Sequence, residues 1–211
     1  MASVSILTIT KKELESRSEA QKLTFVNLEN SKPIIYSFGP LLGHTKYDEG
    51  AAIKALVRHW IAIYEIAPNN VLEPKYLVSS QSEGREKIVG VAVEKIGNKS
   101  LSDFVLARAP ISPTKTSENQ FQLRLAAEQF YESMEKINKF GLYHGNPVPD
   151  LISVFFYGDM VGLKVGSPML ANSNAQHEEL LQNDKKRRRE FQDLMRIGDL
   201  GQRAEFLSNL L

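Results

Sequence analysis

The stretch that decides the fold is residues 140–154, which read Phe-Gly-Leu-Tyr-His-Gly-Asn-Pro-Val-Pro-Asp-Leu-Ile-Ser-Val. The segment before it, 119–139, repeats apolar residues at helical spacing, and Gly141 is the residue type that commonly ends a helix. The apolar run 152–154 at its end is typical of a short strand. The sequence therefore predicts a long helix, then a loop that contains His144 and two prolines, then a strand.

Upstream of this stretch, the sequence predicts two pairs of strands with a helix between them. Residues 23–28 and 33–38 are separated by turn residues and form a predicted hairpin. Residues 76–80 and 87–94 are the second pair. A helix is predicted over 48–66, since apolar residues recur there at four-residue spacing. These residues are Ala52, Leu56, Trp60 and Tyr64, and we expect Trp60 to lie in the core.

The sequence after Val93 becomes polar and contains glycine, and we place a boundary between two lobes there. The predicted fold class is α+β. An N-terminal arm (1–22) precedes a small lobe (23–93) of antiparallel sheet plus one helix. A hinge-like connector (94–100) then leads to a mainly helical lobe (101–211). Within that lobe we expect strands at 152–156 and 161–165, and helices at 119–139, 177–196 and 200–211.

Composition excludes several classes of site and partner. The chain has no cysteine, so disulfides, thiolate nucleophiles and cysteine-based zinc sites are absent, and its four histidines lack metal-ligand spacing. A formal charge of +1 gives no argument for nucleic acid as a partner. The sequence has neither a secretory signal pattern nor a run of about 18 apolar residues, so we expect no membrane partner. We expect a soluble, intracellular and cytoplasmic protein.

The order of these elements resembles that of the protein-kinase-like superfamily, including its aminoglycoside-phosphotransferase-like members. The loop of that family reads His, then Arg or Gly, then Asp, a frequent Pro, Asn and a short strand. His144, Gly145, Pro149 and the strand 152–154 fit this pattern. The resemblance covers roughly residues 23–197 and implies a truncated kinase-like fold.

The catalytic and metal-binding residues of that pattern are not retained in this sequence. The resemblance implies a catalytic Asp at Asn146 and metal-binding Asn and Asp residues at Leu151 and Lys164, while Ser37 falls where the strand lysine is expected. Asn cannot accept a proton at neutral pH, Leu offers no oxygen to a metal, and Lys repels Mg²⁺. The resemblance therefore implies a pseudokinase with a degenerate ATP site and no metal.

The resulting hypothesis is a catalytically inactive module that binds another protein, such as a kinase or a kinase-associated protein, as a regulator or scaffold. Glu94 and Lys164 are the candidates for a weak, metal-independent nucleotide site. The alternative is an atypical small phosphotransferase that uses ATP with a non-standard site, in which Asp150 or Asp159 replaces the missing groups. Both lie beside turns, where Asp is also expected for backbone bonding. A third possibility is a generic α+β interaction protein.

Two further features have a structural and a functional interpretation. His144 is expected to bond nearby backbone rather than to act as a catalyst. The basic run 185–189 is expected to form a solvated helix face that pairs with acidic neighbours, and Arg187, Arg188 and Arg189 are its candidate protein-binding residues. A nuclear-import signal or a patch for an acidic partner is the alternative. The acidic neighbours are Glu178, Glu179, Asp184, Glu190 and Asp193.

Overall fold

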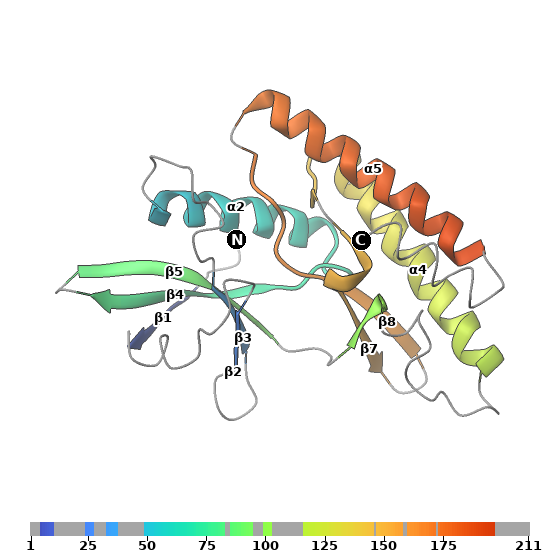
Figure 1. The fold of residues 1–211 in the computed structure, drawn as a ribbon, viewed down its shortest axis with the longest axis horizontal. Coiled ribbons are helices and arrows are strands. Elements are labelled where there is room, and N and C mark those ends of the chain that lie inside the picture. The colour runs from blue at the N-terminus through green and yellow to red at the C-terminus, as the bar shows by residue number, and fades with distance from the viewer. Residues whose placement is uncertain are drawn as a thin grey trace. The chain divides into compact units, whose positions relative to one another are not determined.

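The computed structural model of the 211-residue chain describes ten stretches, and the account that follows is of these residues (Figure 1). They are residues 5–10, 24–27, 33–37, 49–82, 85–94, 99–102, 116–145, 147–157, 160–171 and 173–196. The chain divides into two compact units. Unit 1 comprises 1–62 and 72–95, and unit 2 comprises 63–71 and 96–211. The protein combines helices and strands, so its class is α+β, as predicted.

A five-stranded sheet forms the frame of unit 1, in the order β1-β4-β5-β3-β2. Its strands are β1 (Ser5–Thr10), β2 (Thr24–Asn27), β3 (Pro33–Ser37), β4 (Pro74–Ser82) and β5 (Arg85–Glu94). The pairs β2–β3, β3–β5 and β4–β5 are antiparallel. All four strands predicted for the small lobe are therefore present and lie in one sheet.

Strand β1 was not predicted, and it lies within the stretch assigned to an N-terminal arm. It runs parallel to β4, with Ser5 opposite Tyr76. A parallel pair cannot be joined by a short turn, so no hairpin signal marks it in the sequence. The rest of the predicted N-terminal arm, residues 1–4 and 11–22, lies outside the described residues.

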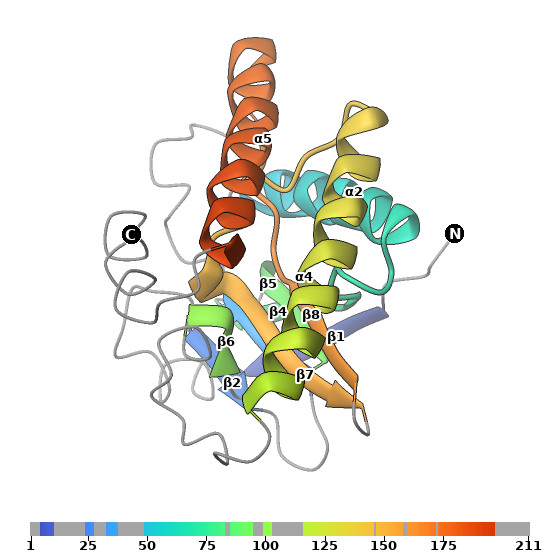
Figure 2. The same cartoon turned by 90° about the vertical axis from the view of Figure 1, so that its right-hand side faces the viewer.

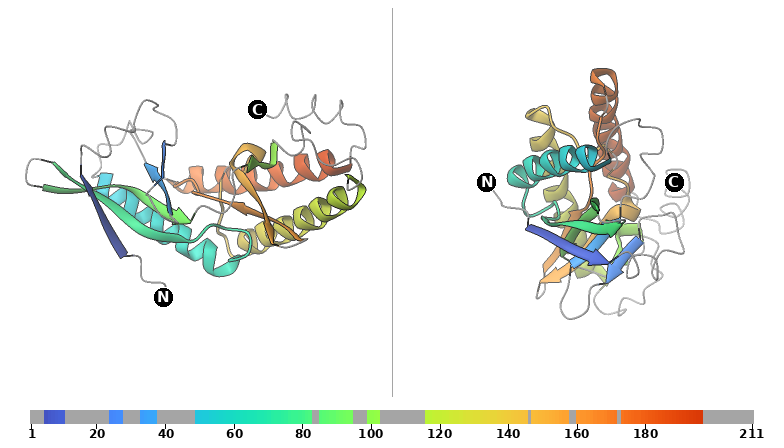
Figure 3. Two further views of the ribbon diagram at one scale, coloured as in Figure 1. Left: turned by 90° about the horizontal axis from the view of Figure 1, so that it is seen from below. Right: turned by 90° about the vertical axis from the view of Figure 1, so that its left-hand side faces the viewer.

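Helix α2 (Glu49–Ile66) lies over one face of the five-stranded sheet (Figures 1 and 3). On its predicted apolar side Leu56 is buried, Ala52 and Tyr64 are half-buried, and Trp60 is fully enclosed, as expected for a core residue. The indole Nε1–H of Trp60 donates a 2.7 Å hydrogen bond to the carbonyl oxygen of Leu72. This bond satisfies the polar end of the buried ring. The last turn of α2 and residues 67–71 belong to unit 2.

Unit 2 contains two long helices that lie side by side and a small antiparallel sheet of order β6-β7-β8 (Figure 2). The helices are α4 (Thr116–Lys139) and α5 (Asn174–Arg196). The strands are β6 (Lys99–Ser100), β7 (Ile152–Tyr157) and β8 (Met160–Val165), with a 3-10 turn η3 (Pro149–Leu151) before β7. Helix α4 packs on β8. The largest fully buried side chains of this unit include Phe130, Ile63, Leu101, Ile137, Ile152, Leu163 and Leu194.

Helix α4 is terminated by a glycine, Gly141, as the sequence predicts. Gly141 adopts a φ of 70°. Its N–H donates to the carbonyl of Asn138 at 3.0 Å, and the N–H of Leu142 donates to the carbonyl of Ile137 at 3.2 Å. These two bonds satisfy carbonyl groups that the helix leaves unpaired, and they turn the chain into the loop at 142–149.

The connector predicted at 94–100 is partly a strand. The chain passes between the two units at three places, and the last of these, between Lys95 and Ile96, lies inside that stretch. Just beyond, β6 pairs with β7, with Lys99 opposite Val154 and Ser100 opposite Ser153. The predicted helix at 200–211 lies outside the described residues.

Candidate functional site

The loop after α4 is held by a carboxylate from α5. Oδ2 of Asp184 accepts the backbone N–H of His144, and Oδ1 accepts that of Gly145, each at 2.7 Å. The side-chain amide of Asn138 also donates to Oδ2, at 3.2 Å. Asp184 is only 1% exposed, so its charge lies inside the unit. The interpretation of Asp184 as a surface partner of the basic run is therefore wrong, because its carboxylate is bonded to the loop.

Burial has the largest effect on the pKa of the Asp184 carboxyl group. Loss of solvation raises the pKa of Asp184 above 3.8, and the hydrogen bonds from His144, Gly145 and Asn138 oppose that shift in part. Hydrogen bonds to charged groups are among the stronger ones in proteins. Asp184 therefore links α5 to the loop through several bonds that form only when both are in place.

His144 is a structural residue of this loop in the geometry seen here. Its side chain is 1% exposed, and Nε2 donates to the carbonyl oxygen of Gly166 at 3.1 Å. Its own carbonyl accepts the N–H of Met169 at 2.8 Å. Both bonds tie the loop to the segment that follows β8. This agrees with the expectation that His144 bonds nearby backbone.

Gly145 occupies a position that only glycine fits well. Its φ is 93°, a conformation that other residues rarely adopt. A β-carbon placed on it would lie 3.0 Å from Cβ of Met169 and 3.1 Å from Cδ2 of Leu180. The loop thus needs glycine here for its backbone conformation and for the close packing around it.

Asn70 makes a second buried network in unit 2, which was not predicted from the sequence. Its side-chain amide donates to the carbonyl of Leu163 at 3.0 Å. Its Oδ1 accepts the hydroxyl of Ser133 at 2.7 Å, and its backbone carbonyl accepts the N–H of Val165 at 2.9 Å. One side chain therefore joins the segment after α2 to both α4 and β8.

The residues at the predicted metal positions lie at the same end of the β7–β8 hairpin. Leu151 directly precedes Ile152, and Lys164 directly precedes Val165; Ile152 and Val165 are register partners. Ile152 and Val165 are fully buried, whereas Leu151 and Lys164 are half-buried. Lys164 stands opposite Ser153. This end of the hairpin thus presents an aliphatic and a cationic side chain.

No cluster of three His, Cys, Asp or Glu side chains that could hold a metal occurs among the described residues. Asp150 lies in η3, next to Leu151. Asn146 and Asp159 fall outside the stretches that the structure describes.

The two candidate residues of unit 1 both end strands. Ser37 is the last residue of β3 and stands opposite Gly90, and Glu94 is the last residue of β5 and stands opposite Pro33. Ser37 and Glu94 therefore occupy opposite ends of the β3–β5 pair, which is antiparallel. The structure does not bring these two candidate residues together.

The basic run of α5 is divided between several environments. Arg187 pairs with Glu190 on the same helix at 3.1 Å, and Arg188 pairs with Glu135 of α4 at 3.3 Å. Arg189 is exposed. Lys186 also pairs with Glu190, at 3.6 Å. The expectation of a helix face paired with acidic neighbours therefore holds for Lys186 and Arg187, while Arg188 joins two helices.

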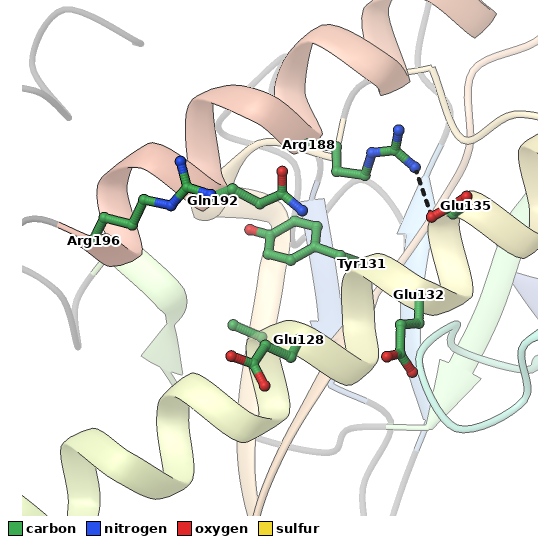
Figure 4. Close-up of a pocket in the computed structure, with 8 residues that line it drawn as sticks. Glu128, Tyr131, Glu132, Glu135, Arg188, Gln192 and Arg196 are labelled. Carbon is green, nitrogen blue, oxygen red and sulfur yellow. Dashed lines mark ion pairs between the residues drawn. The ribbon is translucent and has the colours of Figure 1, made fainter.

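A groove of about 420 Å³ lies between α4 and α5 at this ion pair (Figure 4). It was not predicted from the sequence. The lining residues of α4 are acidic, aromatic or small, and those of α5 are long and polar. They are Ala127, Glu128, Tyr131, Glu132 and Glu135 on α4, and Arg188, Gln192 and Arg196 on α5. The ion pair between Arg188 and Glu135 crosses the groove (Figure 4).

Tyr131 is the buried member of this lining. Its side chain is 6% exposed and packs edge-on against Phe191, with ring centroids 4.8 Å apart. Within the described part of the chain, its hydroxyl has no hydrogen-bond partner. Burial raises the pKa of Tyr131 well above 10.0. The wall of the groove therefore includes a buried, neutral phenol whose hydroxyl has no partner among the described residues.

Comparisons with known proteins do not assign the chain to a family. No family model matches the sequence, and no curated protein matches it. The helices in the described stretches include none that is long and apolar enough to cross a membrane.

Proposed function

We propose that the chain is a catalytically inactive, kinase-like module that acts by binding another protein as a regulator or scaffold. The observation that carries the proposal is the contrast between a well-held loop and the residues beside it. The loop at His144 and Gly145 is bonded to the buried Asp184, while Leu151 and Lys164 stand at the hairpin end that follows. A loop held by several hydrogen bonds, next to positions that lack metal ligands, supports the interpretation of a kinase-like frame without phosphotransferase chemistry.

Phosphoryl transfer needs metal ions to neutralise charge on the phosphates and a residue to orient the nucleophile. Leu151 cannot ligate a metal, and the ammonium group of Lys164 repels one. Asn146 cannot act as a base. A cation at position 164 supports weak nucleotide binding without metal.

Binding of a partner is supported by the surface of α5. The apolar side of this helix, with Leu180, Phe191 and Leu194, is buried within unit 2. Its exposed side is polar and charged, and it borders the groove against α4. A partner would therefore meet charged side chains and the groove rather than an open apolar surface.

A thermal-shift titration with ATP tests the proposal. The wild-type protein should show no stabilisation that depends on Mg²⁺ or Mn²⁺. The double variant Leu151→Asn/Lys164→Asp restores two oxygen ligands and should gain metal-dependent stabilisation by ATP. The matched variant Leu151→Ala/Lys164→Ala removes the same side chains without adding ligands and should gain none.

Metal-dependent stabilisation of the wild type by ATP would favour the atypical phosphotransferase instead. A double variant that is folded by circular dichroism and still gains no metal-dependent stabilisation by ATP would be a different result. It would contradict the assignment of Leu151 and Lys164 to the metal positions of a kinase-like site.

A further inference from the structure

Positive charge is concentrated in unit 2 where the end of α4 lies beside the middle of α5 (Figure 2). The two stretches are 135–139 and 185–190, and the ion pair between Glu135 and Arg188 joins them at 3.3 Å. They contain seven lysines and arginines and two glutamates, a net charge of +5, whereas the whole chain carries +1. We call these seven cations the basic patch. They are Lys136, Lys139, Lys185, Lys186, Arg187, Arg188 and Arg189.

Glu135, the glutamate that α4 contributes to this region, is already shared between two cations. It pairs with Lys139 at 3.1 Å and with Arg188 at 3.3 Å. The hydrogen bond from Lys139 and the charges of Lys139 and Arg188 hold the pKa of Glu135 below 4.5. One carboxylate therefore faces two positive charges here, and the local balance stays positive.

Glu190, the glutamate that α5 contributes, is shared in the same way. It pairs with Lys186 at 3.6 Å and with Arg187 at 3.1 Å. Two carboxylates thus serve four cations, and neither is left to neutralise the other cations of the patch.

Three cations of the patch remain. Lys136, Lys185 and Arg189 form no ion pair with any residue that the structure describes. The residues three and four positions before Lys185 are uncharged, and those three and four positions after it are Arg188 and Arg189. Like charges at this spacing repel each other and weaken a helix. A partner that brings negative charge would relieve this repulsion, which gives a reason for the arrangement.

The arrangement of the free cations indicates which partner fits. Lys185 and Arg189 lie about 6 Å apart along the axis of α5, because four residues of a helix rise by that distance. Arg189 is exposed and Lys185 is half-buried. Two carboxylates of one peptide segment can reach both. A nucleic acid is a poorer match, because proteins that bind it commonly contact about 6–10 phosphates. Glu128 and Glu132 lie one and two turns before Glu135 on α4, outside the patch.

We propose that the basic patch docks an acidic segment of a partner protein, whose carboxylates pair with Lys185 and Arg189. The proposal rests on the proposed function in one respect, namely that the occupant is a protein. It adds the location of the contact and the charge of the partner. It also transfers the main role from Arg187 and Arg188, which are paired within unit 2, to Lys185 and Arg189.

The test uses the full chain and a fluorescein-labelled peptide of alternating Glu and Ala, with binding followed by anisotropy at low ionic strength. Lys185→Gln/Arg189→Gln should weaken binding about 5-fold, because two exposed ion pairs with the peptide are lost. The matched control is Lys54→Gln/Arg58→Gln. It also removes an exposed lysine and an exposed arginine four residues apart on a helix, but from α2. The control should change affinity less than about 2-fold.

Glu135→Gln supplies a gain of binding that a loss of folding cannot imitate. It releases Lys139 and Arg188 from their shared carboxylate, so the acidic peptide should bind about 3-fold more tightly. Circular dichroism should show that all variants remain folded, since none of the replaced side chains is buried. Affinity of the wild type should fall as salt is added, because exposed charges are screened.

Three results would overturn the docking surface. They are no binding of the acidic peptide, equal losses in the patch variant and the α2 control, and equal or weaker binding by Glu135→Gln. Tighter binding of a single-stranded oligothymidylate than of the acidic peptide would assign the patch to nucleic acid instead. These outcomes are separate from the nucleotide titration. Phosphoryl transfer by the wild type would contradict the proposed function and leave peptide binding as measured.

Discussion

The carboxylate of Asp184 on α5 accepts a 2.7 Å hydrogen bond from the backbone N–H of His144, 40 residues earlier in the chain. The same carboxylate accepts the N–H of Gly145. The conformation of the loop is thus set by a helix that follows it much later in the sequence. Any function of the loop, catalytic or structural, depends on that helix being in place.

Replacing Asp184 with Ala should lower the free energy of unfolding by about 3 kcal/mol. The change leaves two buried N–H groups, those of His144 and Gly145, without an acceptor. Chemical denaturation followed by circular dichroism measures the loss. Asp193→Ala, an exposed Asp on the same helix, is the control and should change stability by less than about 0.5 kcal/mol. Similar small effects in both variants would show that the Asp184 bonds add little.

The contribution of Asp184 should also depend on pH. Burial raises its pKa above 3.8, so the folded protein holds this proton to higher pH than the unfolded chain does. The stability that results is greatest below pH 3.8 and is lost as the pH rises through the folded pKa. Asp184→Asn does not titrate and serves as the reference. As the pH rises from about 4 to about 7, the free energy of unfolding of the wild type should therefore fall relative to that of Asp184→Asn. A rise in the stability of the wild type relative to Asp184→Asn over this pH range would contradict the raised pKa.

Gly145→Ala should destabilise the protein more than Gly141→Ala. Both glycines have positive φ, so both changes carry a conformational cost of about 1 kcal/mol. Only at Gly145 would the new methyl group crowd Met169 and Leu180, whereas nothing lies within 4 Å at Gly141. We expect a total loss of about 2–3 kcal/mol at Gly145, measured by thermal unfolding. Equal losses at both positions would show that Met169 and Leu180 move aside freely.

Tyr131→Phe should raise the free energy of unfolding by about 1 kcal/mol, because it removes a buried hydroxyl that has no partner in the described structure. Tyr143→Phe is the opposite case. The Tyr143 hydroxyl accepts the N–H of Ala171 at 2.9 Å, and its removal should destabilise by a similar amount. Chemical denaturation of both variants gives the comparison. A loss of stability in Tyr131→Phe would mean that the hydroxyl has a partner in solution.

The local elements of this chain are predictable because their signals are local. The apolar spacing around Trp60 predicts α2, and Gly141 predicts the end of α4. Strand β1 could not be found in this way, because its partner β4 lies far along the chain and the pair is parallel.

The candidate site was harder to predict, because its polar residues look ordinary in the sequence. Asp184 stands beside the basic run and has the expected appearance of a surface acid, yet it is buried. Asn70 follows a helix end, where Asn is common in turns, yet it bonds β8 and α4. Only tertiary contacts distinguish such residues from solvated ones.

The most direct test of the central claim is an assay for phosphoryl transfer by the full chain, with γ-labelled ATP and either Mg²⁺ or Mn²⁺. The account predicts no hydrolysis of ATP and no labelled product above the level of a buffer control, because the positions of Asn146, Leu151 and Lys164 lack a base and metal ligands. Metal-dependent turnover by the wild type that is lost in Asp150→Asn or Asp159→Asn would contradict it and identify an atypical phosphotransferase.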